Sequence, residues 1–183
     1  MTAEQQTAES ATPSPQPAGP FVGVAVIVPC YNEELTVAKV VADFTQALPG
    51  AQVLVYDNNS TDKTAIVARD AGAVVRRAPR QGKGNVVRQM FDEVDAQIYV
   101  MVDGDGTYPA AAAADLITQL RNTGADMVVG VRMDSFEAGS FRLFHQLGNH
   151  LVAGLISRLF FAKVTDALSG YRAFSRAFVK TVP

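Results

Sequence analysis

The chain has 183 residues, of which 48% are hydrophobic and 19% are charged. A chain of this length and composition can bury a full core, which excludes disorder throughout. The formal net charge of −2 argues against a protein built around nucleic acid. A single cysteine, Cys30, excludes an intrachain disulfide framework, and with only two histidines a structural zinc site is not expected. These features predict a protein of a reducing compartment such as the cytoplasm.

Two parts of the chain differ in charge. Residues 1–120 hold 8 basic and 14 acidic side chains, whereas residues 121–183 hold 8 basic and 4 acidic ones. The first part is therefore net acidic and the second net basic, and we expect them to face different partners.

The first twenty residues differ in composition from everything that follows. They contain four prolines and no Val, Ile, Leu, Phe, Lys or Arg. A signal peptide needs a basic start and an apolar run, so residues 1–20 are predicted to form a disordered tail. Residues 21–183 are predicted to form one domain, because no linker interrupts the hydrophobic pattern there.

From Val22 onward, apolar runs alternate with amphipathic stretches, which is typical of a layered α/β sheet. The predicted strands cover 22–29, 51–57, 73–78, 96–103 and 125–132. The predicted helices cover 34–48, 62–71, 84–94 and 109–122. Ser60, Thr61 and Asp62 are candidate N-caps of the second helix, and Gly72 stands at its expected end. The alternation predicts a mainly parallel central sheet flanked by helices.

A further helix is predicted at 141–161, with an apolar stripe along one side. Arg142, Arg158 and several other polar residues interrupt it too often for a transmembrane span. It can be a helix that packs on the core or one that lies on a membrane surface, and the pattern does not favour either. His145 and His150 lie on different faces of this helix, which argues against a shared metal site.

Polar or glycine-rich segments follow all five predicted strands. Ligands of an open parallel sheet bind beyond the carboxyl ends of its strands, where these segments would meet. Each segment alone could be an ordinary turn, but their coincidence on one edge predicts a binding cleft. The segments are 29–33, 57–60, 76–84, 103–105 and 130–132.

The segment after the fourth strand holds two carboxylates, Asp103 and Asp105, on either side of Gly104. In an extended strand end both side chains would point to the same side. Two hard oxygen donors at such a short separation suit Mg²⁺ or Mn²⁺. The alternative is an Asp-Gly turn, which is weakened because acidic groups at the end of a buried strand need a cation or solvent.

The stretch 76–88 is basic and contains Gly82-Lys83-Gly84 just before a predicted helix. Backbone amides and one ammonium could approach a phosphate-like anion there, although a solvated basic face is an alternative. The stretch lacks a P-loop pattern, and no GxGxxG follows the first strand, which argues against a dinucleotide-binding oxidoreductase. Asp57, at the end of the second strand, could accept hydrogen bonds from a nucleotide base or ribose.

Five motifs in order carry a resemblance to the family 2 inverting glycosyltransferases. They come closest to the branch of dolichyl-phosphate mannosyltransferases and bacterial polyprenyl-phosphate glycosyltransferases, over residues 22–183. The resemblance implies a glycosyltransferase-A fold and a metal-dependent hexosyltransferase. The motifs are VPCYNEE at 28–34, VYDNNSTDKT at 55–64, QGKGNVVR at 81–88, VDGDGTYP at 102–109 and DALSGYRAF at 166–174.

The resemblance also implies roles for single residues on the donor side. Asp57 would hold the base, and Lys83 would lie beside the donor phosphate or sugar. The segment Asp103-Gly104-Asp105 looks like the Asp-X-Asp motif that binds the diphosphate through a divalent metal. The nucleoside pocket would be lined by Pro29, Tyr31, Asn32 and Glu33.

On the acceptor side, Arg132 matches a family position near the phosphates, and Ser169, Gly170 and Arg172 match a segment beside the acceptor. One departure is Asn58-Asn59, where the family usually shows Asp-Gly or Asn-Gly. The chain stops soon after the acceptor motif, so we expect the acceptor side to be truncated.

The implied reaction moves a sugar from a UDP or GDP sugar to a polyprenyl phosphate or a cell-envelope glycan, with inversion at the anomeric carbon. A lipid phosphate is already an anion and needs no general base, whereas a sugar hydroxyl needs one, for which Asp166 is the candidate. The basic surplus of 121–183 predicts peripheral contact with the inner face of the cell membrane.

Two other functions compete with this one. A sugar-phosphate nucleotidyltransferase shares the fold type, but it normally opens with a glycine-rich loop that VPCYNEE lacks. A remnant that binds a nucleotide without turnover stays open, because the chain ends at Thr181-Val182-Pro183.

Overall fold

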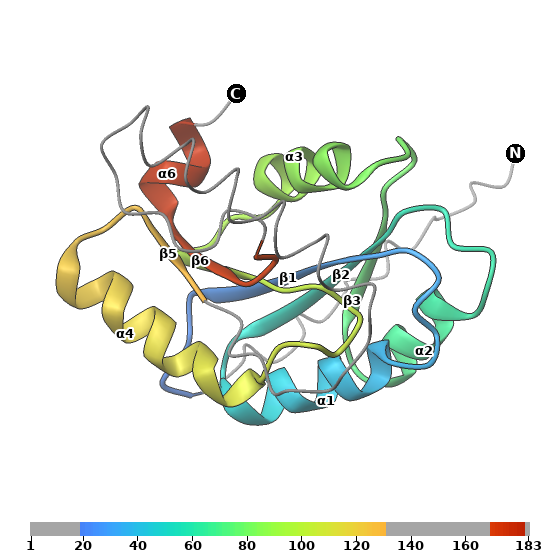
Figure 1. Ribbon diagram of the computed structural model, residues 1–183, viewed down its shortest axis with the longest axis horizontal. Helices are drawn as coiled ribbons and strands as arrows, with labels where there is room; N and C mark the ends of the chain where they lie inside the picture. Colours follow the sequence, from blue (N-terminus) through green and yellow to red (C-terminus); the bar gives the residue numbers. More distant parts are fainter. Residues whose placement is uncertain (1–18, 131–168, 182–183) are drawn as a thin grey trace, which may run out of the picture.

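The computed structural model describes residues 19–130 and 169–181 (Figure 1). Most of the predicted tail and the whole of the predicted helix at 141–161 lie outside these residues. The strands are β1 (Val24–Cys30), β2 (Gln52–Asp57), β3 (Val74–Arg77), β4 (Ile98–Met101), β5 (Met127–Val129) and β6 (Arg172–Ser175). The helices are α1 (Val37–Ala47), α2 (Thr64–Asp70), α3 (Lys83–Glu93), the short 3₁₀ helix η1 (Ala110–Ala112), α4 (Ala113–Thr123) and α6 (Arg176–Thr181).

The strands form one sheet in the order β3-β2-β1-β4-β6-β5. β1 is parallel to both β2 and β4, and β2 is parallel to β3. β6 lies between β4 and β5 and is antiparallel to both. The predicted, mainly parallel sheet is confirmed, and all five predicted strands are found. β6 was missed, because its short sequence RAFS carries no apolar run that would mark a strand.

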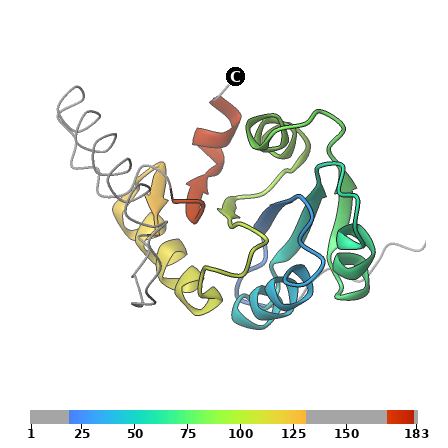
Figure 2. The same cartoon turned by 45° about the vertical axis from the view of Figure 1, so that its right-hand side comes forward.

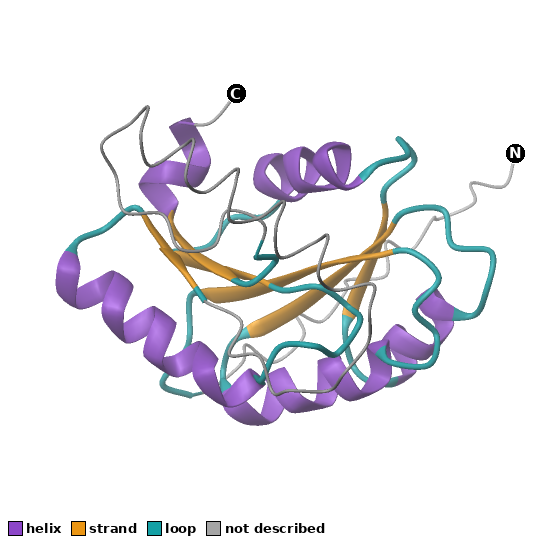
Figure 3. Ribbon diagram, viewed as in Figure 1, coloured by secondary structure: helices purple, strands orange, loops and turns teal. Residues whose placement is uncertain are grey.

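Helices cover both faces of this sheet (Figure 1, Figure 3). α1, α2 and α4 lie on one face, whereas α3 and α6 lie side by side on the other (Figure 1, Figure 2). All seven residues of β1 are buried as a result. Val26 and Val28 belong to the core under α1 and α4, and Ala25 and Ile27 belong to the core under α3.

Three helices begin later than the sequence predicts. α4 starts at Ala113 rather than at 109, because the 3₁₀ turn η1 precedes it. α1 starts at Val37 rather than at 34, because the N–H of Glu33 donates to Thr64 Oγ1 (2.7 Å) and the preceding turn is tied to α2. α2 starts at Thr64 rather than at 62, and its N-cap is Lys63 with no side-chain cap bond. Of the three cap candidates, Asp62 accepts the N–H of Thr64 in the turn before the helix (2.9 Å). Gly72 follows the helix with a φ of +97°, as its place in the sequence predicts.

The parallel strands β1 to β4 all end at the same edge of the sheet, so the loops that follow them are brought together. Among the helices of the two described ranges, none is long and apolar enough to cross a membrane.

Candidate functional site

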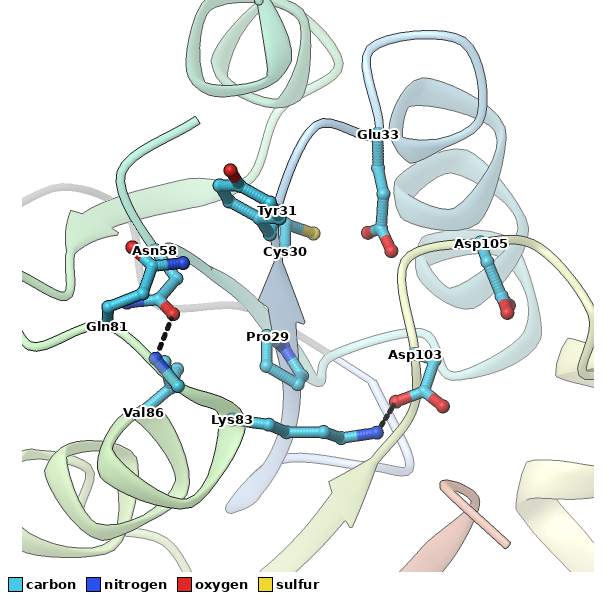
Figure 4. A pocket seen from close by; sticks show the side chains of 11 residues that line it. Pro29, Cys30, Tyr31, Glu33, Asn58, Gln81, Lys83, Val86, Asp103 and Asp105 are labelled. Atoms are coloured by element: carbon cyan, nitrogen blue, oxygen red, sulfur yellow. Dashed lines mark hydrogen bonds and ion pairs between the residues drawn. The ribbon is translucent and has the colours of Figure 1, made fainter. Parts of the chain in front are cut away.

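A cavity of about 340 Å³ opens at this edge of the sheet (Figure 4). Its walls come from the end of β1, from the loops after β1, β2, β3 and β4, and from the first turn of α3. The lining residues are Pro29, Cys30, Tyr31, Glu33, Asn58, Gln81, Gly82, Lys83, Val86, Asp103 and Asp105. Six of the residues predicted for the donor site are therefore brought together: Pro29, Tyr31, Glu33, Lys83, Asp103 and Asp105.

Two predicted residues hold the walls rather than line the cavity. Asn32 adopts a φ of +57°, and its Oδ1 accepts the N–H of Thr61 (2.8 Å) while its own N–H donates to Ser60 Oγ (2.9 Å). Asp57 Oδ1 accepts the N–H of Ser60 (3.3 Å). These bonds fasten the loop after β1 to the loop after β2, so the cavity edge is fixed by side chains that face the backbone.

Glu33 carries the least satisfied polar atom in the site. Its Oε2 is buried and has no hydrogen-bond partner within the described parts of the chain. Burial raises the pKa of Glu33, and the negative charges of Asp105 and Asp103 raise it further, against a hydrogen bond from Cys30 that lowers it. The Glu33 carboxyl therefore binds its proton more tightly than an exposed glutamate does.

Gly104 makes room for this carboxyl. A Cβ at Gly104 would lie 2.0 Å from Glu33 Oε2 and 2.5 Å from Cys30 Sγ, distances that no side chain can adopt. The Cys30 thiol is buried, and burial followed by the charge of Glu33 raises its pKa. Cys30 thus stays a neutral thiol and acts as a small buried wall residue, as predicted.

Asp103 and Asp105 lie in a turn and not in an extended strand end, because β4 already ends at Met101. Asp103 is half-buried and forms an ion pair with the ammonium of Lys83 (Figure 4). Asp105 is exposed, and its Oδ1 accepts both the N–H (3.0 Å) and the O–H (2.7 Å) of Thr107. One oxygen of each aspartate is thereby bonded to the protein.

These carboxylates fit a divalent cation that brings other ligands of its own. Their oxygens are the hard donors that Mg²⁺ and Mn²⁺ prefer. The carboxyl of Glu33, whose Oε2 has no hydrogen-bond partner among the described residues, lies close enough for the charges of Asp103 and Asp105 to raise its pKa. In residues 19–130 and 169–181, no group of three or more His, Cys, Asp or Glu side chains is placed to hold a metal by itself. Asp103 and Asp105 therefore suit an ion whose remaining positions are filled by phosphate oxygens or water.

The C-terminal segment that was assigned to the acceptor side lies against Asp103. A Cβ at Gly170 would stand 2.1 Å from Asp103 Oδ2, so this glycine is in direct contact with the carboxylate. Ser169 is buried and its hydroxyl donates to the carbonyl of Gly130 (2.7 Å). Arg172 Nε donates to the carbonyl of Ser169 (3.0 Å). Two other predicted residues, Arg132 and Asp166, lie outside the described residues.

Two polar residues of the cavity wall, Asn58 and Gln81, lie in segments that were predicted to border the cleft, but sequence reasoning assigned neither of them a role. Asn58 is buried, with 4% of its surface exposed. A signal was available, because a polar residue directly after a buried strand must satisfy its hydrogen bonds within the fold.

Comparison with known proteins agrees with this geometry. Residues 25–182 match the sequence model of one protein family, Glycosyl transferase family 2. Protein RfbJ of Shigella flexneri is 53% identical over 67% of this chain and 95% of its own length. A dolichyl-phosphate hexose transferase of Haloferax volcanii is 33% identical over 88% of this chain and 70% of its own length. The chain spans about half the length of several other curated relatives.

Solved structures show the same arrangement of elements. Glucosyl-3-phosphoglycerate synthase of Mycobacterium tuberculosis, in complex with Mn²⁺ and uridine-diphosphate-glucose, superimposes with a TM-score of 0.70 at 27% identity. The match covers 88% of this chain and 59% of the synthase chain.

Proposed function

Because this chain belongs to glycosyl transferase family 2, we propose that it transfers a sugar from a nucleotide-diphosphate sugar to an acceptor. The predicted resemblance and the glycosyltransferase-A type of fold are confirmed by the family match and by the solved structures. One observation carries the proposal: a single cavity presents the ammonium of Lys83 opposite the carboxylates of Asp103 and Asp105. A cation that faces an acidic pair is suited to a diphosphate and its counter-ion.

We assign the donor to the UDP or GDP class. Pro29, Tyr31 and Glu33 would line the nucleoside end of the cavity, and Asp57 would hold the base beside them. The complex of the mycobacterial synthase with uridine-diphosphate-glucose supports a donor of this kind. Lys83 would leave Asp103 and pair with the donor diphosphate, where its positive charge stabilises the charge that develops on the leaving group.

Asp103 and Asp105 would hold Mg²⁺ or Mn²⁺. When bound, such an ion supplies a Lewis acid that stabilises the departing diphosphate. The synthase complex with Mn²⁺ supports this assignment. Gly104 and Gly170 leave the space that the carboxylates of Glu33 and Asp103 need, so these two carboxylates can be fixed before the donor arrives.

We propose a lipid phosphate as the acceptor, with a cell-envelope glycan as the alternative. The similarity to a dolichyl-phosphate hexose transferase supports the lipid. A phosphate acceptor is already anionic and can attack the anomeric carbon from the face opposite the diphosphate, which inverts that carbon without a general base. A glycan hydroxyl would need a base, and Asp166 is the candidate.

The acceptor would be received by Ser169 and Arg172, with Arg132 near the phosphates. The buried Ser169 and its contact with the carbonyl of Gly130 support a rigid wall here. The reaction would take place in the cytoplasm, with the basic part of the chain resting on the inner face of the membrane.

Calorimetric titration of UDP, GDP and their sugar conjugates, with and without Mn²⁺, tests the proposal. We expect one nucleotide class to bind and Mn²⁺ to strengthen binding, because the diphosphate completes the coordination that Asp103 and Asp105 begin. Asp105→Ala should remove the effect of Mn²⁺. Asp43→Ala, which removes an exposed carboxylate of α1 that pairs with Lys39, should keep it.

Two results would contradict the proposal. One is that no nucleotide binds to the folded protein, and the other is that Asp105→Ala leaves Mn²⁺-dependent binding unchanged. Transfer of radiolabelled sugar to polyprenyl phosphate, measured against donor hydrolysis, then separates a transferase from a protein that only binds the donor.

A further inference from the structure

The side chain of Asn58 holds the loop between β3 and α3. Its Nδ2 donates to the carbonyls of Ala78 (2.8 Å) and Arg80 (2.8 Å), and its Oδ1 accepts the N–H of Gly82 (2.8 Å). Both hydrogens of the Asn58 amide group and one lone pair of its oxygen thus form hydrogen bonds with three residues of one loop. Because only 4% of its surface is exposed, water cannot replace these bonds cheaply.

The hydrogen bond from the Gly82 N–H to Asn58 Oδ1 holds the backbone next to Lys83. Gly82 is the N-cap of α3, adopts a φ of +113° and has no side-chain cap bond of its own. Lys83 is the next residue and the first of the helix, and its ammonium meets Asp103 across the cavity (Figure 4). The position of the Gly82 backbone therefore sets the point from which the Lys83 side chain starts.

The backbone of Asn58 is itself fixed to the first strand. Its N–H donates to the carbonyl of Cys30 (2.8 Å), which is the last residue of β1. A chain of hydrogen bonds thus runs from the centre of the sheet, through Asn58, to the residue before Lys83.

From these contacts we infer that Asn58 is a positioning residue, which sets the place of the Lys83 ammonium by holding the backbone of Gly82. The inference rests on the proposed function, in which Lys83 receives the donor diphosphate. Asn58 need not touch the diphosphate, because its donors and its acceptor are directed at the loop.

The neighbouring Asn59 provides a comparison within the same loop. Its Nδ2 donates to the carbonyl of Pro79 (3.0 Å) and to Gln81 Oε1 (3.2 Å), but it makes no bond to Gly82. Its Oδ1 also accepts a hydrogen bond from Arg77 (3.3 Å). Its φ of +63° is one that glycine adopts without strain, so Asn59→Gly removes these three contacts at little cost to the backbone. We expect this variant to disturb Lys83 far less than Asn58→Ala does.

The first test does not depend on any nucleotide. Competitive acetylation with acetic anhydride, read by mass spectrometry, measures the reactivity of Lys83 against the exposed Lys63. In Asn58→Ala the ion pair with Asp103 should loosen, and the relative rate at Lys83 should rise several-fold. Tyr99→Phe is the control, because it removes two buried hydrogen bonds near Val94 and Ala96 at the opposite end of α3. An equal rate at Lys83 in Asn58→Ala and wild type would overturn the inference.

The second test is a double-mutant cycle on nucleotide affinity in the presence of Mn²⁺. Asn58→Ala should weaken binding by about tenfold in the wild-type background, the scale set by unsatisfied buried groups. In the Lys83→Met background the same change should weaken binding by less than about twofold, since the group that Asn58 positions is gone. Equal losses in both backgrounds would show that Asn58 affects nucleotide binding independently of Lys83 and would overturn the inference.

The two tests separate this inference from the proposed function. If wild type binds no nucleotide, the proposed function fails, and the acetylation experiment alone decides whether Asn58 positions Lys83. If nucleotide binds and the cycle is additive, the proposed function stands and the inference falls.

Discussion

Lys83 pairs with the carboxylate that a divalent cation would need. Its ammonium is bonded to Asp103, and about half of the Lys83 side chain is exposed. Two cations cannot share one carboxylate oxygen without repulsion, so Lys83 and a metal ion would compete for Asp103. The ammonium can leave at low cost, because exposed ion pairs are worth little.

We therefore predict opposite effects of Lys83→Met on the two ligands. Mn²⁺ alone should bind about 1.4- to fivefold more tightly, the range that about 0.2–1 kcal/mol of a partly exposed pair allows. The nucleotide diphosphate should bind more weakly, because it loses its cation. Electron paramagnetic resonance of free Mn²⁺ measures the first effect and calorimetry the second. Weaker binding of Mn²⁺ alone would contradict the competition.

Glu33 makes the stability of the protein depend on pH. Its pKa in the fold is raised above the ordinary value of 4.5, so the folded chain holds this proton more tightly than the unfolded chain does. The free energy of unfolding therefore falls as the pH rises from 4.5 through the raised pKa. Below pH 4.5 the Glu33 carboxyl is protonated in the folded and in the unfolded chain, so it does not change the free energy of unfolding.

Glu33→Gln should remove this fall in the free energy of unfolding with pH, because a glutamine side chain does not ionise. We expect the Tm of Glu33→Gln to exceed that of wild type at pH 8 and to equal it near pH 4, because only the stability of wild type falls as this carboxyl loses its proton. Thermal unfolding followed by circular dichroism at both pH values measures the difference. Asp92→Asn, an exposed change on α3, should leave Tm unchanged. An identical shift at both pH values would rule out the ionisation of Glu33 as the cause.

At the scale of elements, α3 is fastened at both ends. Its start is held through Asn58, and near its end Glu93 accepts hydrogen bonds from the Tyr56 hydroxyl (3.0 Å) and from Arg76 (3.1 Å). Burial raises the pKa of Tyr56 to about 12, and its hydrogen bond to Glu93 acts in the same direction. The hydroxyl thus stays protonated and donates to Glu93 at any pH the protein meets.

The turn before β6 is the element that places Asp103. Gly170 precedes β6 and touches the Asp103 carboxylate, so Gly170→Ala must push that carboxylate aside. We expect Mn²⁺-dependent nucleotide binding to weaken by about ten- to a hundredfold, the cost of a small misplacement at a site of this kind. Gly124→Ala is the matched control, because it strains a φ of +65° at the end of α4 but meets nothing within 4 Å. Calorimetry on both variants measures nucleotide binding. An equal loss of binding in Gly170→Ala and Gly124→Ala would contradict the role of Gly170.

The sequence predicted the elements better than their ends. Strands buried on both faces leave continuous apolar runs, so β1, β2 and β4 were recognised at once. The start of α1 was misplaced because Thr64 takes the Glu33 N–H, a bond between loops far apart in sequence. β6 was missed because its pairing with β4 and β5 cannot be seen in four residues.

The same reasoning applies to the site. Parallel strands end at one edge, so the convergence of Pro29, Glu33, Lys83 and Asp103 could be predicted from their places after strands. The structural role of Asn58 could not be predicted, because its side chain makes its three hydrogen bonds to a loop that lies twenty or more residues further along the chain. Motifs locate the side chains expected to contact ligands, but they say little about the residues that hold those side chains in place.

Across the whole molecule, burial is highest at the centre of the sheet. β1 has a partner on each side and is fully buried, whereas β3 and β5 lie at the edges of the sheet and are partly exposed. We predict that amide hydrogens of β1 exchange slowest and those of β3 and β5 fastest, because edge strands open locally at lower free energy. Hydrogen exchange followed by mass spectrometry measures this, and equally slow exchange in β5 and β1 would contradict it.

The place of β6 in the sheet has a consequence for the order of folding. Among the described strands, β1 to β4 pair with one another, and β6 is the one later strand that joins them, on the free side of β4. During synthesis these four strands can associate as soon as they leave the ribosome. β5 pairs only with β6 among the described strands, so it must wait until Arg172–Ser175 has been made. The contact of Gly170 with Asp103 forms at that same late step, so the Asp103 carboxylate reaches its final position only when β5 and β6 have joined the sheet.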